Sequence, residues 1–278
     1  MSYKQILVPV ITLDADEAAL RTGAQLAESF GGSAIALIVS ISPGSEYAQQ
    51  SPPLSEVLLD LTKGEQSAAA VERREIVTWL NRVKGASEVH NVSAESGLAR
   101  DGAVAYARVA DVIVISRSEE HLRARRELIE DVLFKSGRPV LLLPPGVHKA
   151  PKLERVLIAW NASAEAVRAI AGAMPLLQAA KQVRIVTIDA AQRWAADGKT
   201  PGQGLRAYLA CHGVEAELSN LDGLGREHSL ALADAAMDFG ADFLVLGAYG
   251  HSRAREFVLG GVTRDLLQAA RFPMLLAH

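Results

Sequence analysis

The sequence predicts an α/β fold, built as two tandem doubly wound parallel-sheet domains. The first observation is a repeat: a short apolar run opens each half (residues 5–10 and 155–160), and a proline-led apolar run closes it (residues 138–143 and 272–277). The second is that these runs are apolar on both faces, which is typical of parallel strands covered by helices. The third is that segments with helical periodicity lie between the runs, and such alternation implies right-handed crossovers.

The expected elements follow in chain order. Acidic, alanine-rich helical segments at residues 14–30 and 163–180 follow the first strand of each half. Residues 144–152 are polar and rich in proline, as linkers are, so we place one domain at residues 1–147 and the other at residues 152–278. The expected strands are residues 6–10, 34–41, 112–115 and 140–143 in the first half, and residues 156–160, 183–188, 243–246 and 274–277 in the second.

The first half contains an additional stretch, residues 54–84, in which apolar side chains roughly trace one helical face. The pattern favours a long helix that covers the core. A segment that binds a partner or gates a site is the alternative.

Composition narrows the functional classes. The 278 residues are 49% hydrophobic and 22% charged, as in an ordinary globular protein. The net charge of -3 lacks the positive excess that is typical of nucleic-acid-binding proteins. No stretch approaches the length of a membrane span, and the first residues lack the features of a signal peptide. A single cysteine, Cys211, excludes an internal disulfide and a zinc cluster built on cysteines. We therefore expect a cytoplasmic protein with no nucleic-acid or membrane partner.

A glycine-rich stretch at the end of the seventh expected strand carries the chemistry. The strand ends at Gly247, and Gly260 and Gly261 precede a helical pattern that begins near Val262. Glycines allow the backbone to turn tightly and approach a ligand, and the N–H groups at a helix N-terminus favour phosphate. In a doubly wound sheet, ligands bind at this carboxyl edge, where the strand order reverses.

The spacing in this stretch resembles that of the universal stress protein family. ATP-binding members carry Gly-x-x-Gly, nine residues, then Gly followed by Ser or Thr; here Gly247, Gly250 and Gly260 match the glycines. Gly261 replaces the hydroxyl residue, and Thr263 can supply a hydroxyl two positions later. The resemblance implies an adenine nucleotide alpha hydrolase-like fold, with nucleotide phosphates on the backbone of this loop, from Gly250 through Gly260, Gly261, Val262 and Thr263.

The resemblance also implies where the adenosine would lie. Family members use an Asp at the end of the first strand; here the residue is Asn161, for which a helix N-cap or turn role is the alternative. They also use backbone after the second strand, which corresponds here to Ile188 and Asp189. His251 lies inside the loop and completes the candidate binding residues. We assign no catalytic residue and no metal ligand.

The first half departs further from the family pattern. Its third expected strand, residues 112–115, is followed by Ser116, Arg117 and Ser118 without any glycine pair. A loop without glycines is poorly suited to cradle a triphosphate, so we interpret this half as a degenerate, structural copy that binds no nucleotide.

Two functions remain open. One is a stress-response or signalling protein that binds ATP or a related adenine nucleotide, with Mg²⁺ only when ATP is bound and with slow hydrolysis at most. The other is an interaction protein without nucleotide that acts through dimerisation and an unidentified client protein. The resemblance implies an internal pseudo-dimer in which residues 140–143 pair with residues 274–277, and a further homodimer is left open.

Overall fold

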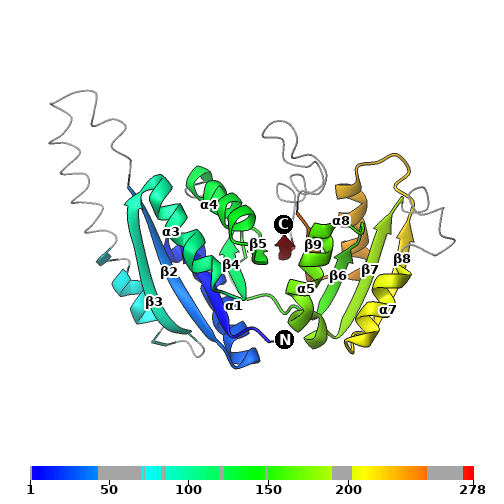
Figure 1. Cartoon of the computed structure of the whole chain (residues 1–278), viewed down its shortest axis with the longest axis horizontal. Coiled ribbons are helices and arrows are strands. Elements are labelled where there is room, and N and C mark those ends of the chain that lie inside the picture. The colour runs from blue at the N-terminus through cyan, green and yellow to red at the C-terminus, as the bar shows by residue number, and fades with distance from the viewer. Residues whose placement is uncertain are drawn as a thin grey trace. The chain divides into compact units, whose positions relative to one another are not determined.

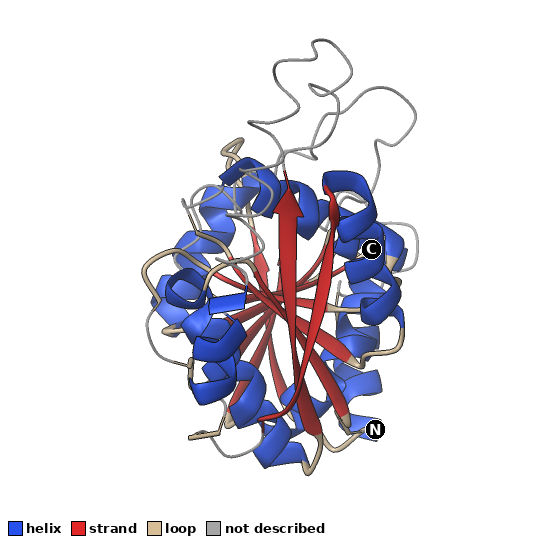
Figure 2. Ribbon diagram, turned by 90° about the vertical axis from the view of Figure 1, so that its left-hand side faces the viewer, coloured by secondary structure: helices blue, strands red, loops and turns tan. Residues whose placement is uncertain are grey.

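The computed structural model describes residues 2–42, 70–71, 73–79, 81–82, 86–118, 122–147, 150–189, 202–248 and 272–278 (Figure 1). The chain forms two compact units. The N-terminal unit holds Ser2–Arg138 with Pro145–Ala150, and the C-terminal unit holds Pro151–His278 with Pro139–Pro144. Figure 2 shows helices on both faces of the strands, as the doubly wound prediction requires.

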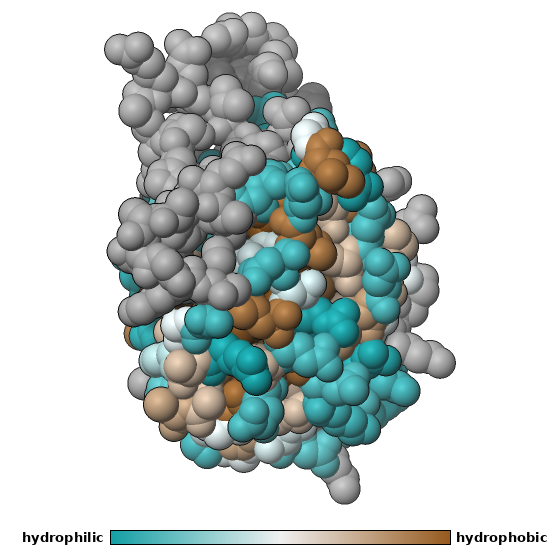
Figure 3. All heavy atoms as spheres, turned by 90° about the vertical axis from the view of Figure 1, so that its right-hand side faces the viewer, coloured by the Kyte–Doolittle hydropathy of each residue, from teal (hydrophilic) through white to brown (hydrophobic). Residues whose placement is uncertain are grey.

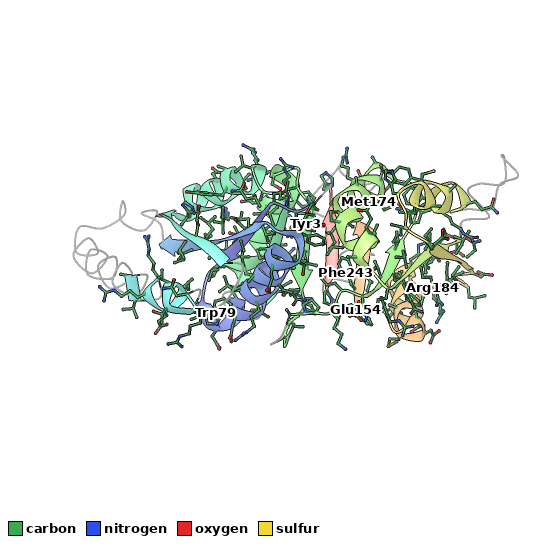
Figure 4. The ribbon with its side chains drawn as sticks, turned by 90° about the horizontal axis from the view of Figure 1, so that it is seen from below. Tyr3, Trp79, Glu154, Met174, Arg184 and Phe243 are labelled. Atoms are coloured by element: carbon green, nitrogen blue, oxygen red, sulfur yellow. The ribbon has the colours of Figure 1, made fainter. Side chains whose placement is uncertain are left out.

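The sheet of the N-terminal unit has the strand order β3-β2-β1-β4, and its pairs are parallel. Helix α1 contacts β1, β2 and β4, whereas α3 contacts β2, β3 and α4 on the opposite face (Figure 4). The elements are β1 (Gln5–Val10), α1 (Leu13–Phe30), β2 (Ser33–Ser42), β3 (Ala86–Glu95), α3 (Ser96–Arg108), β4 (Val112–Ser116) and α4 (Leu122–Lys135).

The stretch between β2 and β3 is described only near its end. Ile76 is completely buried, and the indole Nε1 of Trp79 donates to Oε1 of Glu17 on α1 at 3.2 Å. The guanidinium of Arg21 lies over the same indole, with its carbon 5.2 Å from the ring centroid. These contacts agree with the core-covering interpretation for residues 73–79. Residues 54–69 lie outside the described part of the chain.

The C-terminal unit has the strand order β5-β10-β9-β6-β7-β8. Its strands from β10 to β8 are parallel, and β5 joins β10 as an antiparallel edge. Helices α5 and α7 cover one face and α8 the other (Figure 4). The elements are β5 (Val140–Leu143), β6 (Arg155–Ala159), α5 (Ala164–Ala179), β7 (Gln182–Ile188), α7 (Gln203–Cys211), β8 (Ala216–Leu221), α8 (His228–Phe239), β9 (Phe243–Gly247) and β10 (Met274–Ala277).

The expected pairing of the two terminal strands is confirmed. Leu141 of β5 lies opposite Leu275 of β10, and both side chains are fully buried. The strand that closes the first half of the sequence therefore adds its hydrogen bonds to the sheet of the C-terminal unit. This pairing covers an edge of β10 that would otherwise expose unpaired backbone groups.

The doubly wound α/β fold is confirmed, but each unit also contains a strand that the apolar pattern did not reveal. These are β3 and β8, which end the two strand orders. In β8, exposed Glu217 and Asn220 interrupt the apolar positions. An edge strand has only one neighbour and a partly solvated face, so it lacks the continuous apolar run of a central strand.

Figure 3 shows a largely hydrophilic surface with smaller hydrophobic areas on the face that it draws, the right-hand side of Figure 1.

An aspartate fixes the amino end of the first strand in both units. Asp111 Oδ2 accepts the backbone N–H groups of Lys4 at 2.7 Å and Gln5 at 2.9 Å. In the other unit, Oδ2 and Oδ1 of Asp242 accept from Glu154 at 3.1 Å and Arg155 at 2.9 Å. The repeated Ala-Asp before the strand thus has a structural role.

Asp111 and Asp242 accept their two backbone hydrogen bonds in different ways, and replacement by asparagine distinguishes them. Asp111 uses one oxygen for both bonds, so Asp111→Asn can keep them, and its cost should stay below about 1 kcal/mol. Asp242 uses both oxygens, so Asp242→Asn turns an NH₂ group toward an N–H donor and should cost about 1–3 kcal/mol. Urea unfolding of the full chain measures both, with Asp238→Asn on the exposed surface of α8 as control. Equal losses at positions 111 and 242 would contradict this account.

Candidate functional site

The candidate site lies at the carboxyl edge of the C-terminal sheet. Strand β6 pairs with β7 on one side and with β9 on the other. The chain runs from β6 outward to β7 and β8, and α8 then returns it across the sheet to β9. The winding direction therefore reverses beside β6, and the carboxyl ends of β6 and β9 flank the switch point at which such sheets bind ligands.

Gly247 ends β9 in direct contact with the first turn of α5. A Cβ atom at this position would lie 2.4 Å from the backbone nitrogen of Ala166 and 2.7 Å from the carbonyl carbon of Glu165. Any side chain would push the helix from the strand, so the glycine is required for helix–strand packing. The first glycine of the candidate loop thus positions the N-terminus of α5 at the switch point. The other loop candidates, Gly250, His251, Gly260, Gly261, Val262 and Thr263, lie outside the described residues.

Asn161 lies in the exposed turn between β6 and α5. Its Oδ1 accepts the backbone N–H of Ser163 at 3.0 Å, and Ala162 between them has a positive φ of 57°. Ser163 is the N-cap of α5, because its Oγ accepts the N–H of Ala166 at 3.2 Å. Asn161 therefore has the turn role that the sequence left open. A contact between Asn161 and a nucleotide stays a prediction.

Glu165 in the first turn of α5 is a residue that sequence reasoning missed. Its carboxylate bonds to its own backbone N–H and to Ser163, and these bonds hold its pKa below the ordinary value, with His278 and Arg168 adding to the effect. Partial positive charge at a helix N-terminus favours a carboxylate there. The lowered pKa keeps this carboxylate charged, on a residue that lies against Gly247 at the end of β9.

Asp189 follows β7 and joins two loops. Its φ is 51°, in the left-handed region that non-glycine residues seldom adopt, and its N–H donates to Leu221 O at 3.0 Å. Oδ1 accepts the N–H of Gly223 at 2.7 Å, and Oδ2 lies 3.0 Å from Nε2 of His228. A Cβ at position 223 would lie 2.5 Å from Oδ2, so only glycine allows this approach.

These bonds change what Asp189 can do. The Gly223 N–H lowers the pKa of Asp189, and the bond from His228 lowers it further. Both carboxylate oxygens are engaged by protein groups, so the side chain ties the β8–α8 loop to the end of β7. The neighbouring Ile188 is half-buried. The sequence places Asp189 after the second strand of this half, but α7 and β8 lie between it and His228, so no local pattern could reveal the pair.

The lowered pKa of Asp189 predicts an acid-sensitive contribution to stability. A depressed folded-state pKa means that the contribution is present above the ordinary pKa, about 4, and is lost as pH falls through the folded-state value. Asp189→Asn should therefore lower the Tm at neutral pH, and the difference from the parent should narrow below about pH 4. Thermal unfolding between pH 3 and 7 tests this, and a difference independent of pH would refute it.

The equivalent edge of the N-terminal unit is built differently. Ile6 lies opposite Val112 as Val156 lies opposite Phe243, so Ser116 takes the place of Gly247. After Ser116 the chain leads to α4, and Arg125 of α4 donates a hydrogen bond back to the carbonyl of Ser116 at the end of β4.

Arg125 and Asp16 form a buried ion pair at this edge. Their side chains are 1% and 0% exposed, and Nη1 lies 2.5 Å from Oδ1 and Nη2 3.1 Å from Oδ2. Arg125 also donates to Ser116 O at 3.1 Å, and Asp16 Oδ2 accepts the N–H of Ile11 at 2.8 Å. The pair links the ends of β1 and β4 with α1 and α4. It supplies a physical reason to expect no nucleotide at this edge, because protein groups already bond there.

Breaking this pair on one side should strongly destabilise the N-terminal unit. Arg125→Met leaves the Asp16 carboxylate buried without its partner, and such a loss costs about 3–5 kcal/mol. Arg126→Met on the same helix is the matched control, since Arg126 is 59% exposed and pairs with Glu130 on the surface. Its cost should stay within about 0.5 kcal/mol. Chemical denaturation of the full chain that found similar losses for both variants would overturn the assignment.

The model of the universal stress protein family matches residues 152–278. The C-terminal half belongs to the universal stress protein family. The universal stress protein domain thus comprises the sheet from β6 to β10, including the switch point and the whole glycine stretch.

Solved structures extend the likeness in fold to the whole chain. A universal stress protein from Archaeoglobus fulgidus is 13% identical, with 99% of this chain and 96% of that chain covered and a TM-score of 0.70. A protein provisionally assigned to the same family, from Pseudomonas aeruginosa, is also 13% identical, with 99% and 93% covered and a TM-score of 0.61. At this identity the likeness shows the fold alone. No curated protein matches the chain. Among the described helices, none combines the length and apolar character of a membrane span.

Proposed function

We propose that this universal stress protein binds ATP or a related adenine nucleotide at the carboxyl edge of its C-terminal sheet. The switch point between β6 and β9 carries the proposal, because Gly247 brings the N-terminus of α5 to that place. The glycine stretch that follows has the spacing of ATP-binding family members. Helix N-termini and glycine-led turns are the usual protein ligands of phosphate.

Different residues would bind the phosphates and the adenosine of the nucleotide. The loop backbone from Gly250 to Thr263 would hold the phosphates, and Asn161, Ile188 and Asp189 would contact the adenosine. Asn161 is neutral, whereas Glu165 is held charged close to Gly247. A charged carboxylate opposes a bare triphosphate. Mg²⁺ bound with ATP would offset that repulsion, so the site fits a metal-bound nucleotide better than the free anion.

The nucleotide would serve as a regulatory ligand of a cytoplasmic stress-response or signalling protein. We assign no catalytic residue, so hydrolysis would be slow at most. A client protein and a further homodimer belong to the same proposal.

A second candidate is an interaction protein that binds no nucleotide. It is favoured by Gly261 in place of the hydroxyl residue, by Asn161 in place of an acidic residue, and by the engagement of both Asp189 oxygens. Mass spectrometry of small molecules that co-purify with the full chain separates the two candidates, since only the first predicts an adenine nucleotide.

Two substitutions in the loop test where the phosphates lie. Gly260→Val places a branched side chain where phosphate must approach and should abolish ATP binding while the fold remains. Gly261→Ser restores the missing hydroxyl and should tighten binding about tenfold or more, because one hydrogen bond to a charged group contributes about 1.5–3 kcal/mol. Calorimetry with Mg-ATP should also find one site per chain, in the C-terminal half.

Circular dichroism of both variants controls for folding. ATP binding that is unchanged in both variants would remove the loop from the site. Two equivalent sites per chain would contradict the interpretation of the first half.

A further inference from the structure

The side chains of Asp189 and His228 connect two loops at the carboxyl edge of the C-terminal sheet. Asp189 lies directly after β7, and His228 is the first residue of α8. The Nε2 of His228 lies 3.0 Å from Oδ2 of Asp189, while Oδ1 of the same carboxylate accepts the Gly223 N–H at 2.7 Å. One carboxylate thus holds both the beginning and the end of the β8–α8 loop.

The backbone near Asp189 and His228 takes up conformations that non-glycine residues seldom adopt. Asp189 takes up a left-handed φ of 51°, and Leu224 in the opposite loop has the same φ value. Backbone conformations of this kind persist only where surrounding contacts enforce them. Gly223 is buried and has no room for a Cβ beside the carboxylate. The loop geometry therefore depends on the bonds that Asp189 makes.

The charged groups around His228 come from three places. Asp189 belongs to the end of β7, and Asp222, which also bonds to Asp189, belongs to the end of β8. Glu227 is the N-cap of α8, and Arg226 is paired with Asp234 at 3.1 Å. Histidine is the side-chain type that ordinarily changes charge between pH 5 and 8, whereas carboxylates and guanidinium groups keep their charge over that range.

We propose that His228 and Asp189 form a proton-dependent latch, in which protonated His228 fixes the β8–α8 loop beside the adenosine end of the nucleotide site. Neutral His228 still donates one hydrogen bond to Asp189, whereas the protonated ring adds the attraction of opposite charges. The imidazole is 40% exposed, so solvent screens this attraction. A screened ion pair of this kind shifts the equilibrium between the fixed and the open β8–α8 loop by about two- to fivefold. A loop that is already ordered loses less conformational entropy when nucleotide binds. The latch therefore also couples protonation to nucleotide affinity, a consequence that rests on the proposed function.

Amide hydrogen exchange tests the latch without any ligand. The protection factor of the Gly223 N–H, measured by NMR on the full chain, should fall about two- to fivefold between pH 5.5 and 8.5. His228→Gln keeps a donor near the position of Nε2 but does not titrate, so its protection should be independent of pH. His212→Gln is the matched control, because His212 is exposed beyond the end of α7, where its ring is tilted against that of Tyr208. The same pH dependence in His228→Gln as in the parent would overturn the latch.

A second measurement tests the coupling to nucleotide. Calorimetry with Mg-ATP should show affinity weakening about two- to fivefold over the same range in the parent, with a smaller change in His228→Gln. Protonation of ATP itself contributes equally to both proteins and cancels in the comparison. Identical pH profiles would overturn the coupling. If no ATP binds at any pH while Gly223 behaves as expected, the proposed function fails and the latch stands.

Discussion

The first turn of α5 can lie against the end of β9 only because residue 247 has no side chain. This close approach brings a helix N-terminus and its cap, Ser163, to the strand at which the winding of the sheet reverses. The turn at Asn161 and the charged Glu165 take their positions from the same helix. The candidate site therefore depends on one contact between two backbones, which a single Cβ atom would disrupt.

The N-terminal unit shows what replaces this contact when the glycine is absent. Ser116 stands at the equivalent strand end, and Arg125 reaches it from α4 together with Asp16 from α1. A buried ion pair makes its own hydrogen bonds and fixes local geometry, so Arg125, Asp16 and the end of β4 bond to one another at this edge. The two units share a scaffold, down to the aspartates that clamp β1 and β6, and differ where ligand chemistry would occur.

The pairing of β5 with β10 has a related consequence for the whole chain. An edge strand of one sequence half completes the sheet that is formed by the other half, so the two repeats are joined by more than their linker. In the antiparallel register of this pairing, Leu141 lies opposite Leu275.

By itself the sequence determined the doubly wound fold, the central strands, the pairing of the terminal strands and the place of Gly247 at the end of a strand, because these follow from apolar periodicity and from a repeat visible along the chain. The edge strands β3 and β8 escaped because half-solvated strands carry no continuous apolar run. Only the tertiary structure decided the roles of individual polar residues: that Gly247 serves helix packing, that Asp189 is engaged by Gly223 and His228, and that Arg125 meets Asp16. Such partners lie tens of residues apart in sequence, and their bonds arise only when the crossovers bring the strand ends to one edge of the sheet.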